Sequence, residues 1–357
     1  MYNIFFDIYY IGLLLIVLVE FIFKLSLSHT FSSNKGTGAQ PFIVLFIILL
    51  SIWMGFRPPS ESFGDTLLYK SVYEMGEFRF SDVGFNVFSL LCKRFGFSSD
   101  IYLSLIAFLY IFLPYMFLSR RIDSSWYGLL FVIGSFSFLG YGINGIRNGL
   151  STSLLLYSFI FLRNQTENGK DKIIPLIICC ILSISIHKSA VLPVFCLFVS
   201  IYKIKTINAA INLWLISIPV SLLAGGPISS LFMGLGFDER LDGYLKAELT
   251  KGFRWDFVLY SMVPIVLAYY INKKKIIIDR IYQIMIVTYI LSNALWIIVI
   301  SASFSNRFAY LSWFMYPFVI VYPILKFRIW EKQISKDALI LFSYFLFSFV
   351  MHFFVYN

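Results

Sequence analysis

The sequence predicts an all-α protein, a polytopic transmembrane helical bundle with about 12 membrane helices. Of the 357 residues, 59% are hydrophobic and only 13% are charged, a balance that would not keep a water-facing globule of this length soluble. Apolar runs approaching ~20 residues recur along the whole chain, and short polar stretches separate them. We therefore expect a single integral membrane domain over residues 1–357.

The apolar runs place each expected helix in order. The first run, Ile4 to Phe23, lacks a basic leading region and a small-residue cleavage pattern, so we expect a membrane helix there and not a cleaved signal. Some runs are shorter than the roughly 20 residues that a crossing helix needs, and 173–202 is either two spans or one broken, re-entrant pair. The predicted spans are 4–23, 41–56, 99–118, 125–141, 146–162, 173–186, 188–202, 207–224, 257–271, 281–300, 307–325 and 337–355.

The basic loops set the predicted orientation, because cytoplasmic loops of membrane proteins are enriched in Lys and Arg. These loops share one face if the stretch 84–96, which carries Lys93 and Arg94, lies at the membrane interface and does not cross. Both termini and the two longest loops, near 57–83 and 225–256, then lie outside. Membrane topology thus accounts for the formal charge of +10, and no nucleic-acid partner is expected.

The enrichment of Lys and Arg in cytoplasmic loops does not explain the arginines on the predicted outer face. Arg57, Arg147 and Arg307 all lie there, close to helix ends. A cation at the membrane is costly unless it has a partner. Several guanidinium groups on one leaflet therefore predict an anionic ligand such as a phosphate or pyrophosphate.

The first outer loop predicts a short helix with Asp65 at its N-cap. Tyr69 and Tyr73 are four residues apart and share one face of that helix, where they are expected to line a sugar-binding rim. The alternative interpretation is an aspartate cap with interfacial tyrosines.

Two further polar clusters open or interrupt helices on the same face. Asn144 and Arg147 fall on one side of a starting helix, and a guanidinium at a helix N-terminus is poorly placed for the helix dipole, so we expect it to have another partner. His187 and Lys188 interrupt the run 173–202, and His is the natural proton acceptor near neutral pH. A packing role for His187 is the alternative.

Neither a metal nor a cofactor is expected. The four cysteines lie in apolar stretches without ligand spacing, and the sequence has no phosphate-cradling glycine loop, zinc motif or nucleophile elbow.

In their order along the chain, these motifs resemble the EpsG-type branch of the Wzy family of O-antigen and polysaccharide polymerases. The resemblance is carried by Arg57, Gly64-Asp65 with Tyr69 and Tyr73, Gly84-Phe85-Asn86, Asn144-Gly-Ile-Arg147-Asn148, His187-Lys188-Ser189 and Asn306-Arg307-Phe308. The family usually has Arg-Gln where this chain has Arg147-Asn148.

The resemblance implies a GT-C-like, metal-independent membrane glycosyltransferase of the bacterial inner membrane, with its active site facing the periplasm or outside. It would transfer a growing glycan from undecaprenyl pyrophosphate to the next lipid-linked repeat unit, so its partners would be lipid-linked donor and acceptor, membrane lipid and a chain-length regulator protein. The candidate bases are His187 and Asp65. The candidate ligand-binding residues are Arg57, Arg147, Arg307, Asn144, Lys188, Tyr69 and Tyr73.

Two alternatives belong to other classes. A transporter, such as a flippase for the same lipid-linked oligosaccharide, would show internal repeats and polar residues near the bilayer midplane, whereas the polar clusters here gather on one predicted face. A membrane acyltransferase would need a route for a cytoplasmic acyl donor, and the predicted cytoplasmic loops are short and merely basic.

Overall fold

The structure is a computed structural model whose regular elements are all helices, with no strand in the described residues. It describes residues 2–26, 39–59, 63, 65–76, 82–164, 169–234, 253–298, 300 and 305–356. The all-α prediction is confirmed. Contacts divide the chain into two compact units, 1–161 with 173–187 and 324–357 (unit 1), and 162–172 with 188–323 (unit 2).

Each predicted apolar run coincides with helical segments. Within the described residues, six stretches are long and apolar enough to cross a membrane: 4–23, 99–121, 207–224, 280–298, 309–326 and 333–354. The ranges 41–55, 173–186 and 188–202 are shorter apolar helices. These helices fit a membrane-embedded protein. The total of about 12 spans, the GT-C-like architecture and the single membrane domain stay predictions.

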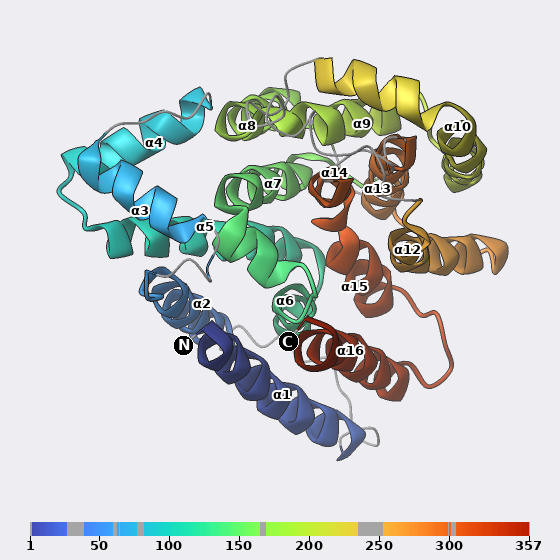
Figure 1. Cartoon of the computed structure of the whole chain (residues 1–357). Coiled ribbons are helices and arrows are strands. Elements are labelled where there is room, and N and C mark those ends of the chain that lie inside the picture. Colours follow the sequence, from blue (N-terminus) through green and yellow to red (C-terminus); the bar gives the residue numbers. More distant parts are fainter. Residues whose placement is uncertain are drawn as a thin grey trace. The chain divides into compact units, whose positions relative to one another are not determined.

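Unit 1 contains most of the candidate site residues, and Figure 1 labels its α-helices. Its helices are α1 (Tyr2–Ser26), α2 (Ala39–Gly55), α3 (Thr66–Met75), α4 (Val83–Arg94), α5 (Ser99–Arg121), α6 (Ser125–Ile133), η3 (Gly140–Asn144), α7 (Ile146–Ser158), η4 (Phe159–Phe161), α8 (Ile173–Ile186), α16 (Gln333–Val350) and η6 (Met351–Tyr356). Helix α2 packs on α5, α5 on α7, and α7 on α8, while α1 runs along α16.

The packing of α2 on α5 depends on the absence of a side chain at Gly55. A Cβ atom there would lie 2.4 Å from the Ser104 backbone nitrogen and 2.5 Å from its Cα, distances that real Cβ contacts do not reach. Small residues let membrane helices approach closely.

We expect Gly55→Ala to lower the stability of unit 1 by about 1–3 kcal/mol, because α2 and α5 must move apart. Gly12→Ala on α1 is the matched control, since nothing lies within 4 Å of the position that a Cβ atom would take there. The control should unfold at the wild-type temperature or slightly above it. Thermal unfolding in detergent micelles measures both, and equal unfolding temperatures would contradict the close-packing role of Gly55.

The predicted helix 125–141 is not continuous. Helix α6 ends at Ile133, and the chain turns before the π-helix η3 begins at Gly140. Gly134 and two serines in this turn have low helix propensity. The Tyr110 hydroxyl donates to the Phe138 carbonyl at 3.0 Å and so satisfies a backbone group that the helix break frees.

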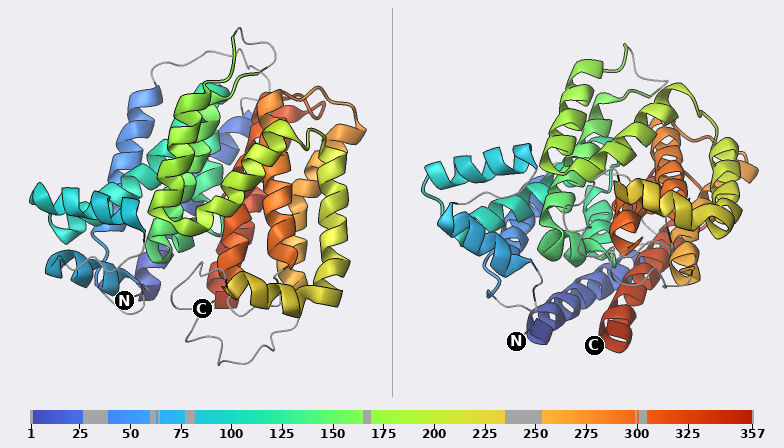
Figure 2. Two further views of the ribbon diagram at one scale, coloured as in Figure 1. Left: turned by 90° about the horizontal axis from the view of Figure 1, so that it is seen from above. Right: turned by 45° about the horizontal axis from the view of Figure 1, so that its top comes forward.

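Helices α3 and α4 lie across the direction of α2 (Figure 2, left). In α4, Phe85, Ser89 and Cys92 are buried, and the opposite side is apolar and exposed. The exposed apolar side chains are Val83, Val87, Leu90 and Leu91. An amphipathic 12-residue helix of this kind fits the predicted interfacial position of 84–96.

Unit 2 is arranged around α13. Its helices are η5 (Lys188–Ala190), α9 (Val191–Tyr202), α10 (Ile207–Gly234), α12 (Trp255–Lys273), α13 (Arg280–Ile298), α14 (Ser305–Trp313) and α15 (Tyr316–Lys326), whose last turn extends past the unit boundary. Helix α13 is apolar on nearly all sides because α9, α10, α12 and α14 pack around it.

Polar side chains join these helices inside unit 2. The Trp214 indole donates to Asn293 at 2.7 Å, and the Asn293 amide donates to Ser312 at 3.1 Å. Such bonds between buried side chains stabilise helix contacts in an apolar medium.

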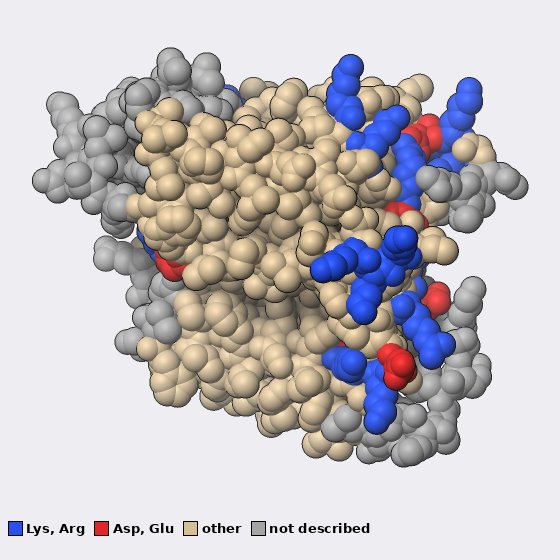
Figure 3. All heavy atoms as spheres, turned by 90° about the vertical axis from the view of Figure 1, so that its right-hand side faces the viewer, with Lys and Arg blue, Asp and Glu red and all other residues tan. Residues whose placement is uncertain are grey.

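The predicted outer loop 225–256 is shorter than expected, since α10 continues to Gly234 and α12 begins at Trp255. The range 235–252 lies outside the described residues. On the face drawn in Figure 3, Lys and Arg side chains gather beside a broad area without charge. Within unit 2, Lys203 and Lys205 follow α9, and the run Lys273–Lys275 begins at the last residue of α12. The sidedness of the protein stays a prediction.

The first and last helices of unit 1 share a polar contact. His352 Nε2 lies 3.0 Å from the Asp7 carboxylate, and the His352 ring stacks on Tyr10 with ring centroids 4.4 Å apart. An ionisable pair within apolar helices is expensive unless both members are satisfied, so this pair fixes α1 against η6.

Candidate active site

One buried carboxylate joins two of the predicted site residues. Asp82 Oδ2 accepts a hydrogen bond from Arg147 Nη1 at 2.6 Å and lies 3.3 Å from His187 Nδ1. The three residues come from the start of α4, the first turn of α7 and the end of α8. Arg147 thus has a carboxylate partner from a distant part of the chain, and its predicted anionic ligand stays a prediction.

The Asp82 contact fixes the form of the His187 ring. A carboxylate paired with Arg147 only accepts hydrogen bonds, so Nδ1 of a neutral His187 carries the proton. The lone pair is then on Nε2, which is the nitrogen that can accept a proton. An Asp-oriented imidazole of this kind is a common general base.

The side chains of Asp82, Arg147 and His187 differ in their exposure to solvent. The side chains of Arg147 and His187 are 19% and 23% exposed, whereas that of Asp82 is only 2% exposed. A ligand can therefore reach the cation and the imidazole, while the carboxylate between them is shielded from water.

Asp82 stands at the N-cap position of α4, yet its side chain makes no capping hydrogen bond there. Its carboxylate contacts Arg147 and His187 instead. The next residue but one, Gly84, lies against α8, because a Cβ at Gly84 would be 2.9 Å from the Ser185 carbonyl carbon. This close approach brings the start of α4 to the end of α8 and so brings Asp82 to His187.

A pair of serines sets the register of α7 against α8. Ser151 Oγ donates to the Ser183 carbonyl at 2.7 Å, and Ser183 Oγ donates to the Ser151 carbonyl at 2.8 Å. Ser151 is one turn after Arg147, and Ser183 is one turn before His187. Residues four apart lie on the same helix face, so the serine pair holds Arg147 beside His187.

The local backbone before Arg147 is unusual. The π-helix η3 ends with a bond from the Gly145 N–H to the Gly140 carbonyl at 2.9 Å, and α7 starts at the next residue. Short π-helices occur frequently at functional sites. Arg147 then lies in the first turn of α7, where its Nε donates to the Tyr69 hydroxyl at 3.0 Å.

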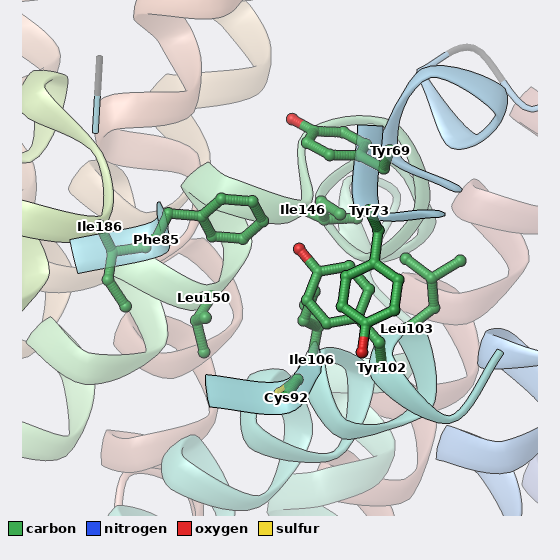
Figure 4. Packing of buried hydrophobic residues seen from close by; sticks show 10 residues of the cluster. All are labelled: Tyr69, Tyr73, Phe85, Cys92, Tyr102, Leu103, Ile106, Ile146, Leu150 and Ile186. Carbon is green, nitrogen blue, oxygen red and sulfur yellow. The ribbon is translucent and has the colours of Figure 1, made fainter. Parts of the chain in front are cut away.

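Tyr69 and Tyr73 share one face of α3, as predicted. Both are 3% exposed and belong to a hydrophobic cluster with residues of α4, α5 and α7 (Figure 4). The Tyr73 ring stacks on Tyr102 with centroids 4.2 Å apart, and its hydroxyl donates to the Phe97 carbonyl at 2.8 Å. In this structure the two tyrosines pack in the hydrophobic cluster, and the Tyr69 hydroxyl contacts Arg147. Their contact with sugar stays a prediction.

Arg57 is buried, with a side chain that serves as a clamp. Its Nε donates to Thr66 Oγ1 at 2.9 Å, Nη1 to the Met54 carbonyl at 2.7 Å and Nη2 to the Ile143 carbonyl at 3.4 Å. These bonds tie the end of α2 to α3 and η3. Burial lowers the pKa of Arg57 to about 10, so the group remains charged at neutral pH.

We expect Arg57→Met to lower the free energy of unfolding by about 3 kcal/mol, because buried acceptors lose a charged donor. Arg254→Met is the control, since Arg254 forms an exposed ion pair with Asp256 that is worth ~0–1 kcal/mol. Thermal unfolding in detergent measures both variants. Wild-type unfolding of Arg57→Met, together with lost binding of inorganic pyrophosphate, would contradict the clamp and favour the predicted ligand role.

The other predicted site residues have different placements. Asp65 occupies the N-cap position of α3 but makes no side-chain capping bond, and Asn144 is exposed at the end of η3. Lys188 is exposed at the start of unit 2. Arg307 lies in the first turn of α14, and its side chain lies outside the described part of the structure. Their roles stay predictions.

Asp82 was not among the predicted site residues. It lies 65 positions from Arg147 and 105 from His187 in sequence, and nothing nearby in the chain reveals those partners. The available signal was an acidic residue two positions before the Gly84-Phe85-Asn86 motif.

The four cysteines are buried and free. In the part of the chain that the structure describes, no three or more His, Cys, Asp or Glu side chains form a group that could hold a metal ion.

Comparison with known proteins identifies the family. None of the curated proteins and none of the solved structures compared matches the chain. The family model described as "EpsG family" matches residues 41–357, a range that contains Asp82, Arg147, His187 and all the predicted site residues. Since the match covers most of the sequence, the chain belongs to the EpsG family.

Proposed function

We propose that this protein is a polysaccharide polymerase, a glycosyltransferase that extends a glycan on a lipid carrier. Membership of the EpsG family supports a membrane polysaccharide polymerase-like activity. The single observation that carries the proposal is the meeting of Arg147 and His187 on Asp82. A cation and an oriented imidazole, both partly accessible, suit a reaction that expels a diphosphate and takes up one proton.

In the proposed reaction, a hydroxyl of the acceptor sugar attacks the anomeric carbon of the donor glycan. The new C–O bond forms as the bond between that carbon and the undecaprenyl diphosphate oxygen breaks, and the electron pair leaves with the diphosphate. Arg147 stabilises the developing negative charge, because a guanidinium matches phosphate oxygens in charge and geometry. His187 Nε2 accepts the hydroxyl proton.

The remaining assignments rest on the family resemblance and the predicted topology. Arg307 and Lys188 would add charge for the diphosphate, Asn144 would contact substrate, and Asp65 is the second candidate base. The donor and acceptor would be undecaprenyl-pyrophosphate-linked oligosaccharides at the outer face of the bacterial inner membrane, and the reaction would need no metal. A chain-length regulator protein is a further proposed partner.

The test is incubation of the purified protein with lipid-linked repeat units, with product length read on a gel. A ladder of products supports the polymerase. In vesicles that contain the protein, unchanged repeat units that move to the opposite leaflet would instead favour the flippase. When an acyl donor is also supplied, formation of an acylated, unextended repeat would favour the acyltransferase.

A further inference from the structure

We propose that Asp82 couples diphosphate binding to the basicity of His187, so that the base becomes active when the donor arrives. This inference rests on the proposed function and assigns Asp82 as a positioning residue. The observation behind it is that one oxygen, Asp82 Oδ2, serves both Arg147 at 2.6 Å and His187 at 3.3 Å.

The two contacts compete for the same carboxylate. The short contact to Arg147 is a strong, charge-assisted hydrogen bond, and the longer contact to His187 is weaker. While Arg147 neutralises the carboxylate, Asp82 stabilises an imidazolium only weakly. In the unliganded arrangement, Asp82 is therefore held mainly by Arg147.

A diphosphate changes this balance. Arg147 is partly exposed, whereas Asp82 is buried, so an anionic ligand can approach the guanidinium from the accessible side. Its charge then offsets that of Arg147, and the carboxylate is left to interact with His187. An opposite charge at this distance favours the protonated form of an imidazole. Donor binding would thus make His187 a stronger base at the moment when the acceptor hydroxyl must lose its proton.

Other polar and charged groups lie near this site in space or in sequence. The Tyr69 hydroxyl accepts a hydrogen bond from Arg147 Nε, and Lys188, the first residue of unit 2, follows His187 in the chain. Several polar and charged residues of α3, α4 and the start of α5 contact one another: Lys70 pairs with Asp100, Lys93 donates to the Glu74 carbonyl, and Ser99 donates to the Glu74 carboxylate. Arg94 is exposed at the end of α4. Asp82, which also holds Arg147, is accordingly the charged group that the described contacts place on the His187 ring.

The experiment is an NMR titration of isotope-labelled histidine in the full-length protein in nanodiscs, with and without inorganic pyrophosphate as the probe. The chain has only three histidines, and His187→Gln identifies the signal of His187. We expect pyrophosphate to raise the titration midpoint of His187 by about one pH unit or more. His352, which pairs with Asp7, is the internal control and should not move.

Two variants separate coupling through Asp82 from the direct effect of the ligand's charge. In Asp82→Asn, the midpoint should be lower than in the wild type and should respond little to pyrophosphate. In Arg147→Gln, where the competitor for the carboxylate is gone, the midpoint should already be raised without the probe. A full wild-type rise in Asp82→Asn, or an unchanged midpoint in Arg147→Gln, would overturn the coupling.

Chain extension measured on the same preparations keeps the two proposals apart. Wild-type protein that forms a product ladder but shows no pyrophosphate-dependent shift overturns the coupling and leaves the polymerase standing. A shift in protein that forms no ladder supports the coupling and counts against the polymerase.

Discussion

Arg147→Ala is expected to reduce chain extension by at least about 100-fold, which is the usual cost of removing one group that stabilises developing charge. Arg147 is held in place by Asp82, and its side chain is accessible to a ligand. The measurement is the rate of product-ladder formation from lipid-linked repeat units. Retention of long products by this variant would remove Arg147 from the reaction.

Arg147→Ala also has a structural effect that must be separated from the catalytic one. Removing one member of a buried pair leaves an uncompensated charge and costs about 3–5 kcal/mol, so this variant should unfold at a lower temperature. The double variant Arg147→Gln with Asp82→Asn replaces the ion pair by two neutral amides. We expect it to recover most of the stability and none of the activity, and recovery of both would mean that the pair is structural.

His187→Gln is expected to reduce chain extension by about 10²–10⁴-fold, the typical contribution of a general base. The reason is the geometry of the ring, whose Nδ1 faces Asp82 and whose Nε2 holds the lone pair. The pH dependence of the rate is the second readout. In the wild type, activity should fall as the pH drops and His187 becomes protonated, and this fall should be absent from the residual activity of His187→Gln.

His352→Gln is the matched control for a lost histidine. His352 also contacts a carboxylate, that of Asp7, but it lies in η6 and has no contact with Arg147 or Asp82 among those described. We expect wild-type chain extension from this variant after correction for folded protein. If His187→Gln extended chains equally well, the base role would pass to Asp65 or to water.

Most of the helices were predictable from the sequence because an apolar run marks each of them, whereas α3 was predicted from its N-cap. Breaks in those runs were harder to predict. The polar interruption at His187 and Lys188 correctly marked the end of α8, whereas 125–141 was taken as one helix because its turn, from Gly134 onward, is built of small and apolar residues. A turn inside the apolar bundle needs no charged residue, so hydropathy alone does not reveal it.

The site was only partly predictable for a related reason. Arg147 could be singled out because a cation at a helix N-terminus is locally unfavourable, and the structure supplies its partner in Asp82. Arg57 was singled out only as an arginine on the predicted outer face, and its donors are taken up by Thr66 and two backbone carbonyls. Sequence shows that a buried cation needs a partner, but only the fold shows whether the partner is the protein itself.

The contact between Asp7 and His352 has a practical consequence for anyone who trims this chain. The family match begins at residue 41, so a natural choice of shortened protein would omit α1. That truncation would remove the carboxylate partner of the His352 imidazole and would uncover the side of α16 on which α1 packs. Affinity tags and fusion partners should therefore be added to a chain that keeps α1 and should not replace that helix.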